Sequence, residues 1–320
     1  MDNEEFVKSY LYNPQKQFDR QHLLTHFKEY RLDPEYAVLE KDDYPSYYDT
    51  PFPFVHPDYA HPSRPFWMSP TEVTQAEFRD RMGYNPSYFA ACGDSCPVEN
   101  VTWFQALDYA NHRSEAEGLE TCYVLTGCTE RNASCQKVEF RGLDCRGYRL
   151  PTDEEWRYMS KKNGNYGERC EYRRLSGEDV AAAIAEVHGT NWEALEDIAW
   201  TQENAEIRYE GCRRVSKTVE SELHVPLDTQ SCIGPHPVGT KAPDANGLYD
   251  FYGNVYEWVW DWFGYARRSG DSLGPDRGIC RIMRGGSVFT DTDDYAVYRP
   301  GCYLPDMGGS VLGFRLVRTL

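Results

Sequence analysis

Threonines that can cap a helix precede apolar residues at helical spacing in three parts of the chain. In each part the threonine is followed three residues later by glutamate or glutamine, the capping-box pattern in which each side chain accepts from the other residue's backbone amide. In the second part, Phe104, Leu107 and Ala110 recur at helical spacing and predict one buried face. Three short helices are therefore predicted to begin after Thr74, Thr102 and Thr152.

The pattern divides the chain into an extension and a globular part. Residues 1–66 combine one or two short predicted helices with a run of prolines and aromatic residues that suits an extended arm. Residues 67–320 have the pattern of helix and strand signals expected of a globular domain, with short strands predicted at CYVLTGC and QKVEFRG. Within this domain, residues from about 165 to about 235 are predicted to be an insertion, with one helix and otherwise irregular structure.

The charge balance excludes several classes of partner. The 320 residues carry 34 basic and 51 acidic side chains, a net charge of −17. Nucleic acids and anionic membranes require a basic face, so neither is an expected partner. The sequence also holds no run of 18 apolar residues, so no membrane-spanning helix is expected.

The cysteines and the N-terminal residues point to different compartments. The 11 cysteines include a close set that resembles a disulfide framework, which favours a periplasmic, cell-surface or secreted protein. Cys92 and Cys96 form the simplest expected loop within it. The start, MDNEEFVKSYLYNPQ, lacks the pattern of a signal peptide, which favours the cytoplasm instead. Both readings stay open at this point.

Several motifs in a fixed order resemble one known family. They are MSPTEVTQAEF, CPVENVTWFQALDYANHRS, GYRLPTDEEWRYMSKKNG, HPVGTKAPDANGLYDFYGNVYEWVWDW, MRGGS and LGFRLVR. Together they are similar to the formylglycine-generating enzymes, also called sulfatase-modifying factors, over roughly residues 66–320. The resemblance implies an irregular α+β fold with little regular secondary structure, related to the C-type lectin fold. It does not fix activity, because one fold can serve many functions.

The segment DFYGNVYE has the residues for a calcium site. Gly253 permits a tight turn, Asp250 and Glu257 supply carboxylates on either side of it, and the carbonyls of Gly253 and Val255 can complete a set of oxygen ligands. The family resemblance implies calcium at the same place. The alternative is that Glu257 only pairs with an arginine such as Arg315. Of these two interpretations the calcium site is favoured, so calcium is the expected cofactor.

The segment RGGSVFTDTDDYAVYRPGC matches the family's active site except in its chemistry. In catalytic members the serine is followed by two cysteines, at the third and eighth positions, whose thiolates bind copper(I). Here Ser287 matches, but Thr290 and Tyr295 stand at the two cysteine positions. Neither side chain offers a redox-active thiol, so copper is not expected. Cys280 and Cys302 lie at other positions and are predicted to be structural.

What remains after Ser287 is a polar segment suited to binding. Its predicted ligand contacts are Thr290, Asp291, Asp293, Asp294 and Tyr295. The acidic residues suit a basic partner or a second cation, or form only a solvated loop. The favoured hypothesis is therefore a non-catalytic protein that binds a peptide, protein or glycan. The alternatives are an oxidoreductase that modifies a thiol with non-standard residues, and a structural scaffold.

Overall fold

A computed structural model of the chain describes residues 62, 64–159, 197–211, 213–220, 226–244, 246–263, 273–290 and 300–320, with only the backbone for residues 213–220 and 226–231. The chain divides into two compact units, residues 1–54 and 55–320, and every described residue belongs to the second. The predicted extension thus lies almost wholly outside the described residues, as does much of the predicted insertion.

The three predicted helices are present, and each begins with its capping box. At the third, the Glu155 amide donates to Thr152 Oγ1 at 3.1 Å, and the Glu155 carboxylate accepts from the Thr152 amide at 2.9 Å. The second buries Phe104, Leu107 and Ala110, as the periodicity predicts. The helices are α3 (Gln75–Met82, after Thr74), α4 (Trp103–Ala116, after Thr102) and α5 (Asp153–Met159, after Thr152).

The strands within the described residues form four small sheets. A three-stranded sheet has the order β1-β11-β4, a four-stranded sheet has the order β10-β7-β8-β9, and β2-β3 and β5-β6 are separate pairs. Both strands predicted from sequence are confirmed as β2 and β3. The bounds are β1 Phe66–Met68, β2 Tyr123–Cys128, β3 Cys135–Phe140, β4 Tyr148–Arg149, β5 Arg213–Glu220, β6 Pro226–Ile233, β7 Tyr256–Trp262, β8 Arg281–Arg284, β9 Gly301–Tyr303, β10 Leu312–Gly313 and β11 Val317–Thr319.

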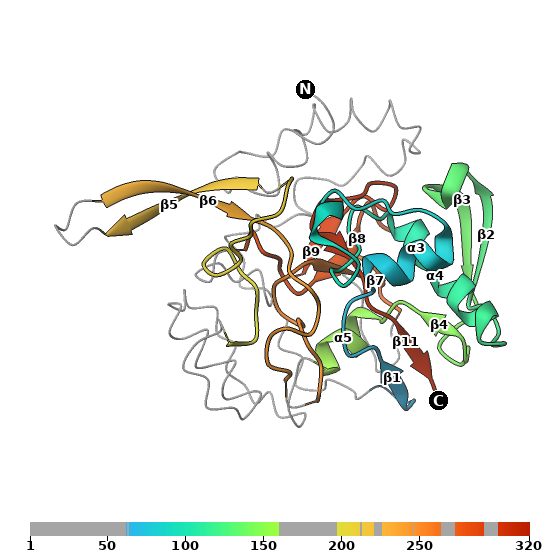
Figure 1. Ribbon diagram of the computed structural model, residues 1–320. Helices are drawn as coiled ribbons and strands as arrows, with labels where there is room; N and C mark the ends of the chain where they lie inside the picture. The colour runs from blue at the N-terminus through green and yellow to red at the C-terminus, as the bar shows by residue number, and fades with distance from the viewer. Residues whose placement is uncertain are drawn as a thin grey trace, which may run out of the picture. The chain divides into compact units, whose positions relative to one another are not determined.

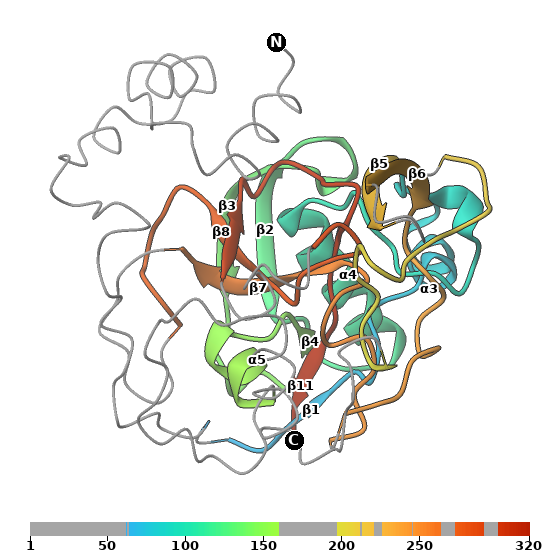
Figure 2. The same cartoon turned by 90° about the vertical axis from the view of Figure 1, so that its left-hand side faces the viewer.

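The four-stranded sheet brings together motifs that are distant in the sequence. β7 lies between β10, to which it is parallel, and β8, to which it is antiparallel. In this register Glu257 of β7 lies opposite Arg284 of β8 and opposite Gly313 of β10. Gly313 is two residues before Arg315 in the sequence. By contrast, β5 and β6 form a long ribbon that extends away from these sheets in Figure 1 and is seen nearly end-on in Figure 2.

The core consists of aromatic-rich clusters around the helices. The largest surrounds α4 and includes Trp103, Trp258 and Phe314, each at most 1% exposed. A second cluster packs Trp156 of α5 on Phe251, with ring centroids 4.3 Å apart. Aromatic residues bury a large area each, so these clusters hold together a domain with little regular structure.

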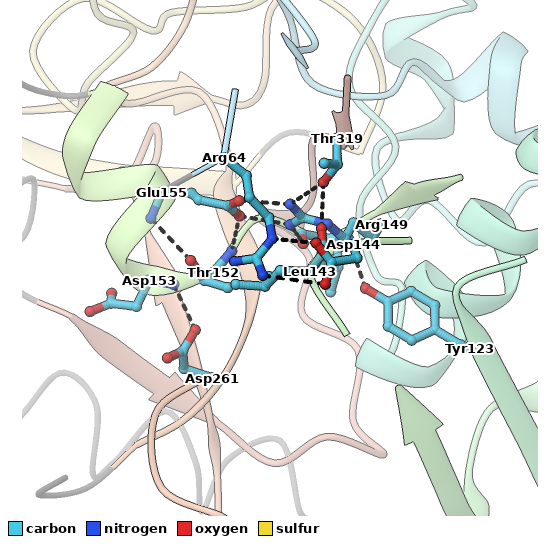
Figure 3. Close-up of polar contacts among 11 residues, drawn as sticks. Arg64, Tyr123, Leu143, Asp144, Arg149, Thr152, Asp153, Glu155, Asp261 and Thr319 are labelled. Carbon is cyan, nitrogen blue, oxygen red and sulfur yellow. Dashed lines mark hydrogen bonds and ion pairs between the residues drawn. The ribbon is translucent and has the colours of Figure 1, made fainter. Parts of the chain in front are cut away.

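A buried ion pair anchors α5 to the sheets. The Arg149 guanidinium donates two bonds of 2.7 Å to the two oxygens of Glu155 and a third bond, of 3.1 Å, to Thr319 Oγ1 (Figure 3). Such bidentate pairing is the strong form of a charge-assisted hydrogen bond. It ties β4, the first turn of α5 and β11 at one point, because each element contributes one partner.

Disulfides confirm the framework expected from the cysteine spacing. Cys92–Cys96 is present, as predicted, and Cys280 and Cys302 are paired with each other in a structural role. Other described pairs are Cys122–Cys145 and Cys128–Cys135. Disulfides of this kind persist in oxidising environments, so they indicate an extracellular or periplasmic protein. Among the described residues, no helix has both the length and the apolar character needed to cross a membrane.

Candidate functional site

The segment that corresponds to the family's active site leaves β8 through two glycines. Gly285 and Gly286 have φ values of 94° and 78°, a left-handed conformation that side chains disfavour. Backbone bonds then hold the segment against the calcium-site turn, because the Gly253 amide donates to Gly285 at 2.8 Å and the Val288 amide donates to Asn254 at 2.9 Å. The two predicted sites are therefore adjacent.

Ser287 and Thr290 form a closed, buried turn. The Ser287 amide donates to Thr290 Oγ1 at 2.9 Å, and the Thr290 amide donates to the Ser287 carbonyl at 2.9 Å. Ser287 Oγ accepts from the Phe289 amide at 3.2 Å, and its residue is fully buried. Both hydroxyls thus have structural roles, and neither lies ready as a nucleophile.

The first of the two thiolate positions is occupied by a hydroxyl that faces the interior. Thr290 is only 4% exposed, and its Oγ1 lies 3.4 Å from the hydroxyl of Tyr256. A side chain this buried offers almost no surface to a ligand, so the direct contact predicted for Thr290 would require the turn to open. The other predicted contacts, Asp291, Asp293, Asp294 and Tyr295, lie outside the described residues.

Part of the predicted insertion packs against this segment, which the sequence did not indicate. The Gln202 amide donates to the Thr290 carbonyl at 3.1 Å, and the Asn254 amide donates to the Trp200 carbonyl at 2.8 Å. Trp200 stacks on His236, with ring centroids 3.7 Å apart and an angle of 6° between the planes. This stack holds Trp200 in place, and the Trp200 carbonyl in turn holds the turn at Gly253 and Asn254.

The predicted calcium turn is tight and strained. Asp250, Gly253 and Asn254 all have left-handed φ values, of 50°, 77° and 53°. A Cβ on Gly253 would lie 2.2 Å from the Trp200 carbonyl oxygen, so only glycine fits there. Gly253 and Val255 are both buried. Strained backbone of this kind persists where the surroundings hold it in place, and it clusters at functional sites.

Glu257, a predicted calcium ligand, has other partners. Its Oε1 accepts from Arg315 Nε at 2.8 Å and lies 2.6 Å from a terminal guanidinium nitrogen of Arg315. Its Oε2 accepts from Trp156 Nε1 at 2.8 Å. The alternative considered from sequence, a Glu257–Arg315 pair, is therefore present. Arg315 is fully buried, and its remaining donors bind backbone carbonyls.

Unsatisfied carboxylate oxygens lie close to this pair, on two other residues. Glu72 is fully buried, and neither of its oxygens has a hydrogen-bond partner among the described residues. Asp250 Oδ2 accepts from the Gly239 amide at 2.6 Å, whereas Oδ1 has no partner within the same described set. Three buried carboxylates thus interact with the positive charge of Arg315, and Lys241 adds a weaker attraction at Asp250.

The electrostatics of these carboxylates follow from burial and mutual repulsion. Burial, and then the charge of Asp250, raise the pKa of Glu72 well above its ordinary value. Burial raises the pKa of Asp250 to about 6, against the lowering effects of the Gly239 amide and Arg315. Desolvation disfavours the charged form of a carboxyl group, so both residues gain from a proton or a cation.

The donors present fit a hard cation in part. Glu72 and Asp250 offer free carboxylate oxygens, which calcium prefers, but Glu257 is committed to Arg315. Within the described part of the chain, no group of three or more His, Cys, Asp or Glu side chains is arranged to hold a metal ion. A calcium ion here would be held by two carboxylates and by backbone carbonyls. Glu72 was not predicted as a site residue, because nothing in the segment MSPTEVTQ indicates that its glutamate is buried.

Comparison with known proteins agrees with the fold and the motifs. The chaperone protein LppX of Paenibacillus barcinonensis is 27% identical over 260 residues, which cover 79% of this chain and 80% of that protein. The formylglycine-generating enzyme of Streptomyces coelicolor is 28% identical over 176 residues, which cover 53% of this chain and 46% of the enzyme. The solved structure of Treponema denticola variable protein 1 is 29% identical, with a TM-score of 0.58, and the match covers 80% of this chain and 84% of that one.

The family assignment rests on a match along most of the chain. Residues 56–320 match the sulfatase-modifying factor enzyme 1-like domain. The described elements give the irregular α+β fold that the motifs predicted. The chain spans less than half of the Streptomyces enzyme, so that enzyme's activity does not transfer with the fold. The chain belongs to the sulfatase-modifying factor family, and formylglycine-generating enzymes are among its relatives.

Proposed function

We propose that this chain is a non-catalytic binding protein that holds an extended polypeptide beside the turn at Ser287. One observation carries the proposal: at the first thiolate position of the catalytic relatives, this chain has Thr290, buried and bonded to Ser287. A hydroxyl in this environment cannot bind copper(I) as a soft thiolate does. The segment retains the two glycines and the serine of the family's motif, and Thr290 stands where the motif has its first cysteine.

A polypeptide ligand is favoured over a glycan by two features. The relative LppX, which this chain matches along most of its length, bears the name of a chaperone protein. The residues that follow Thr290 include Asp291, Asp293 and Asp294, on a chain with a net charge of −17. Complementary charge steers binding partners and sets specificity, so the ligand would carry basic residues.

An aggregation assay tests this proposal. A chemically unfolded, basic client protein is diluted into buffer with and without equimolar protein, and light scattering is followed. We expect the protein to suppress scattering, and the suppression to weaken as salt is raised, because screening reduces charge steering. Glycan binding measured in parallel separates the two ligand classes: binding to a glycan with no effect on the client would contradict the polypeptide proposal.

A charge-matched pair of variants locates the surface. The combined change Asp291→Asn, Asp293→Asn and Asp294→Asn is expected to slow client association by about tenfold, within the range over which steering alters on-rates. The control removes three exposed charges elsewhere, by Asp80→Asn, Glu115→Gln and Glu130→Gln, whose side chains are 73%, 62% and 90% exposed. Equal effects of the two triple variants would show that net charge alone, and not this surface, governs binding.

A further inference from the structure

Among the described residues, Tyr88 is the most exposed aromatic side chain. Its exposed fraction is 60%, against 42% for Trp67 and 39% for Tyr158. Its hydroxyl makes no hydrogen bond to a described residue, whereas the hydroxyl of Tyr209 donates to the Pro235 carbonyl at 2.6 Å. A single exposed aromatic residue is common on protein surfaces, so the setting of Tyr88 decides whether it binds a ligand.

The backbone beneath Tyr88 is held on both sides. The buried Glu99 carboxylate accepts from the amides of Tyr88 at 3.1 Å and Phe89 at 2.7 Å. The Phe89 carbonyl accepts from Gln75 Nε2 at 3.2 Å, and Ser87 Oγ accepts from the Glu99 amide at 3.3 Å. A loop fixed in this way presents the aromatic ring in one position, so a ligand that binds the ring does not have to order the loop.

Ring contacts connect Tyr88 to the turn at which the polypeptide is proposed to bind. The Tyr88 ring packs edge-on against Phe89, with centroids 4.9 Å apart and an angle of 83° between the planes. Phe89 is 1% exposed, and its ring centroid lies 6.4 Å from that of Phe289, the residue before Thr290. Tyr88 is therefore the exposed end of a row of three rings that begins in the turn.

Acidic residues lie next to this exposed ring. The Tyr88 carbonyl oxygen is 4.0 Å from the position that a Cβ would take on Gly211, so residues 202–211 end beside Tyr88. This segment carries three glutamates and one arginine, and Glu206 and Glu210 are exposed. On a chain with a net charge of −17, such a surface attracts cationic groups.

We propose that Tyr88, Glu206 and Glu210 form a subsite for an arginine side chain of the polypeptide ligand. The subsite rests on the proposed function, because it specifies which side chains of that polypeptide are bound. A guanidinium is planar, stacks on an aromatic face and donates to carboxylates, so one arginine uses both features of this surface. Its aliphatic stem packs on the ring while the charged group stays partly in water.

Two substitutions at Tyr88 test the contact between the cation and the ring. A fluorescein-labelled glycine–serine peptide with spaced arginines is titrated with the protein at low salt, and fluorescence anisotropy gives the dissociation constant. Tyr88→Phe keeps the aromatic face, so we expect binding within about twofold of wild type. Tyr88→Leu keeps apolar area without the aromatic face, so we expect binding to weaken about three- to fivefold, as for a cation–π contact at an exposed site.

A matched control removes an exposed tyrosine elsewhere. Tyr158→Leu alters a side chain of α5 that is 39% exposed, and we expect it to leave peptide binding unchanged. Thermal melts of the variants check that each is folded. Equal binding by Tyr88→Leu and Tyr88→Phe, or equal weakening by Tyr88→Leu and Tyr158→Leu, would overturn the assignment of Tyr88 as the ring that binds arginine.

A footprint on the wild-type protein does not depend on the folding of variants. Tyrosines are nitrated with tetranitromethane, with and without saturating arginine peptide, and peptide mass spectrometry gives the rate at each site. We expect the peptide to slow nitration of Tyr88 at least about threefold and to leave Tyr158 unchanged. Suppression of client aggregation with Tyr88 unprotected would overturn the subsite and leave the binding role intact, whereas neither suppression nor peptide binding would overturn both.

Discussion

Replacement of Arg315 by methionine is expected to lower the free energy of unfolding by about 3–5 kcal/mol, the usual cost of leaving a buried charge without its partner. Arg315 is fully buried and supplies the positive charge shared by Glu72, Asp250 and Glu257. Methionine has a similar volume, so the loss would report charge and hydrogen bonding rather than a cavity. Urea unfolding, followed by tryptophan fluorescence, measures the change.

The neighbouring strand offers a matched control. Arg318→Met removes a half-buried arginine of β11 whose guanidinium lies 5.9 Å from the centre of the Tyr148 ring. We expect a loss of about 1 kcal/mol or less, as for partly exposed charges and cation–π contacts. Adding Glu257→Gln to Arg315→Met should recover part of the larger loss, because it removes the carboxylate left unpaired. Equal losses for the two arginines would contradict the account of the cluster.

In the absence of divalent cations, stability is expected to fall as the pH rises from about 4 to about 7. The pKa of Asp250 is raised to about 6 and that of Glu72 is raised well above its ordinary value, so the folded protein holds more protons than the unfolded chain in this window. When the folded state binds more protons than the unfolded state, the free energy of unfolding decreases as the pH rises. For Asp250 alone, the shift from 3.8 corresponds to about 3 kcal/mol.

Calcium is expected to reverse this loss at neutral pH. An ion bound only by the folded protein adds about 2.7 kcal/mol at a hundredfold excess over its dissociation constant. Thermal melts at several pH values, with EGTA or with added calcium, measure both effects. An unchanged melting temperature on chelation, for protein purified with calcium, would mean that protons alone compensate these carboxylates.

Two substitutions separate the possible ligands. Combining Glu72→Gln with Asp250→Asn is expected to abolish the response to calcium, because these residues carry the unsatisfied oxygens. The pH dependence is expected to weaken rather than vanish, because burial also raises the pKa of Glu99 to about 8. Glu257→Gln is expected to destabilise the protein yet leave the calcium response, because Arg315 and Trp156 already bind Glu257. The opposite pattern would restore the ligand set inferred from the sequence, in which Glu257 binds calcium directly.

The local signals in the sequence were sufficient for the helices and for the family. Capping at Thr74, Thr102 and Thr152 depends on residues three positions apart, and all three boxes form. The short strands on either side of the Cys128–Cys135 pair were also visible, because a hairpin is a local structure. Ordered motifs then gave the fold, since motifs spread along a domain identify its architecture when no single one does.

The contacts within the candidate site were less accessible from the sequence, because they join residues far apart in the chain. Glu72 and Arg315 are separated by most of the domain, and only folding places them beside Asp250. From its local sequence, Glu257 could be either a calcium ligand or the partner of an arginine. In the structure Trp156 and Arg315 donate to its oxygens, which favours the ion pair with Arg315. Gln202 reaches Thr290 from a segment whose irregular sequence gave no periodic signal.

The most direct test of a non-catalytic role is mass spectrometry of a cysteine-containing sulfatase peptide incubated with the protein, copper and oxygen. A formylglycine-generating enzyme from a related source serves as the positive control. We expect the peptide mass to stay unchanged, with or without copper, because Thr290 and Tyr295 replace the two thiols that the reaction needs. Appearance of the aldehyde product, dependent on this protein, would contradict it.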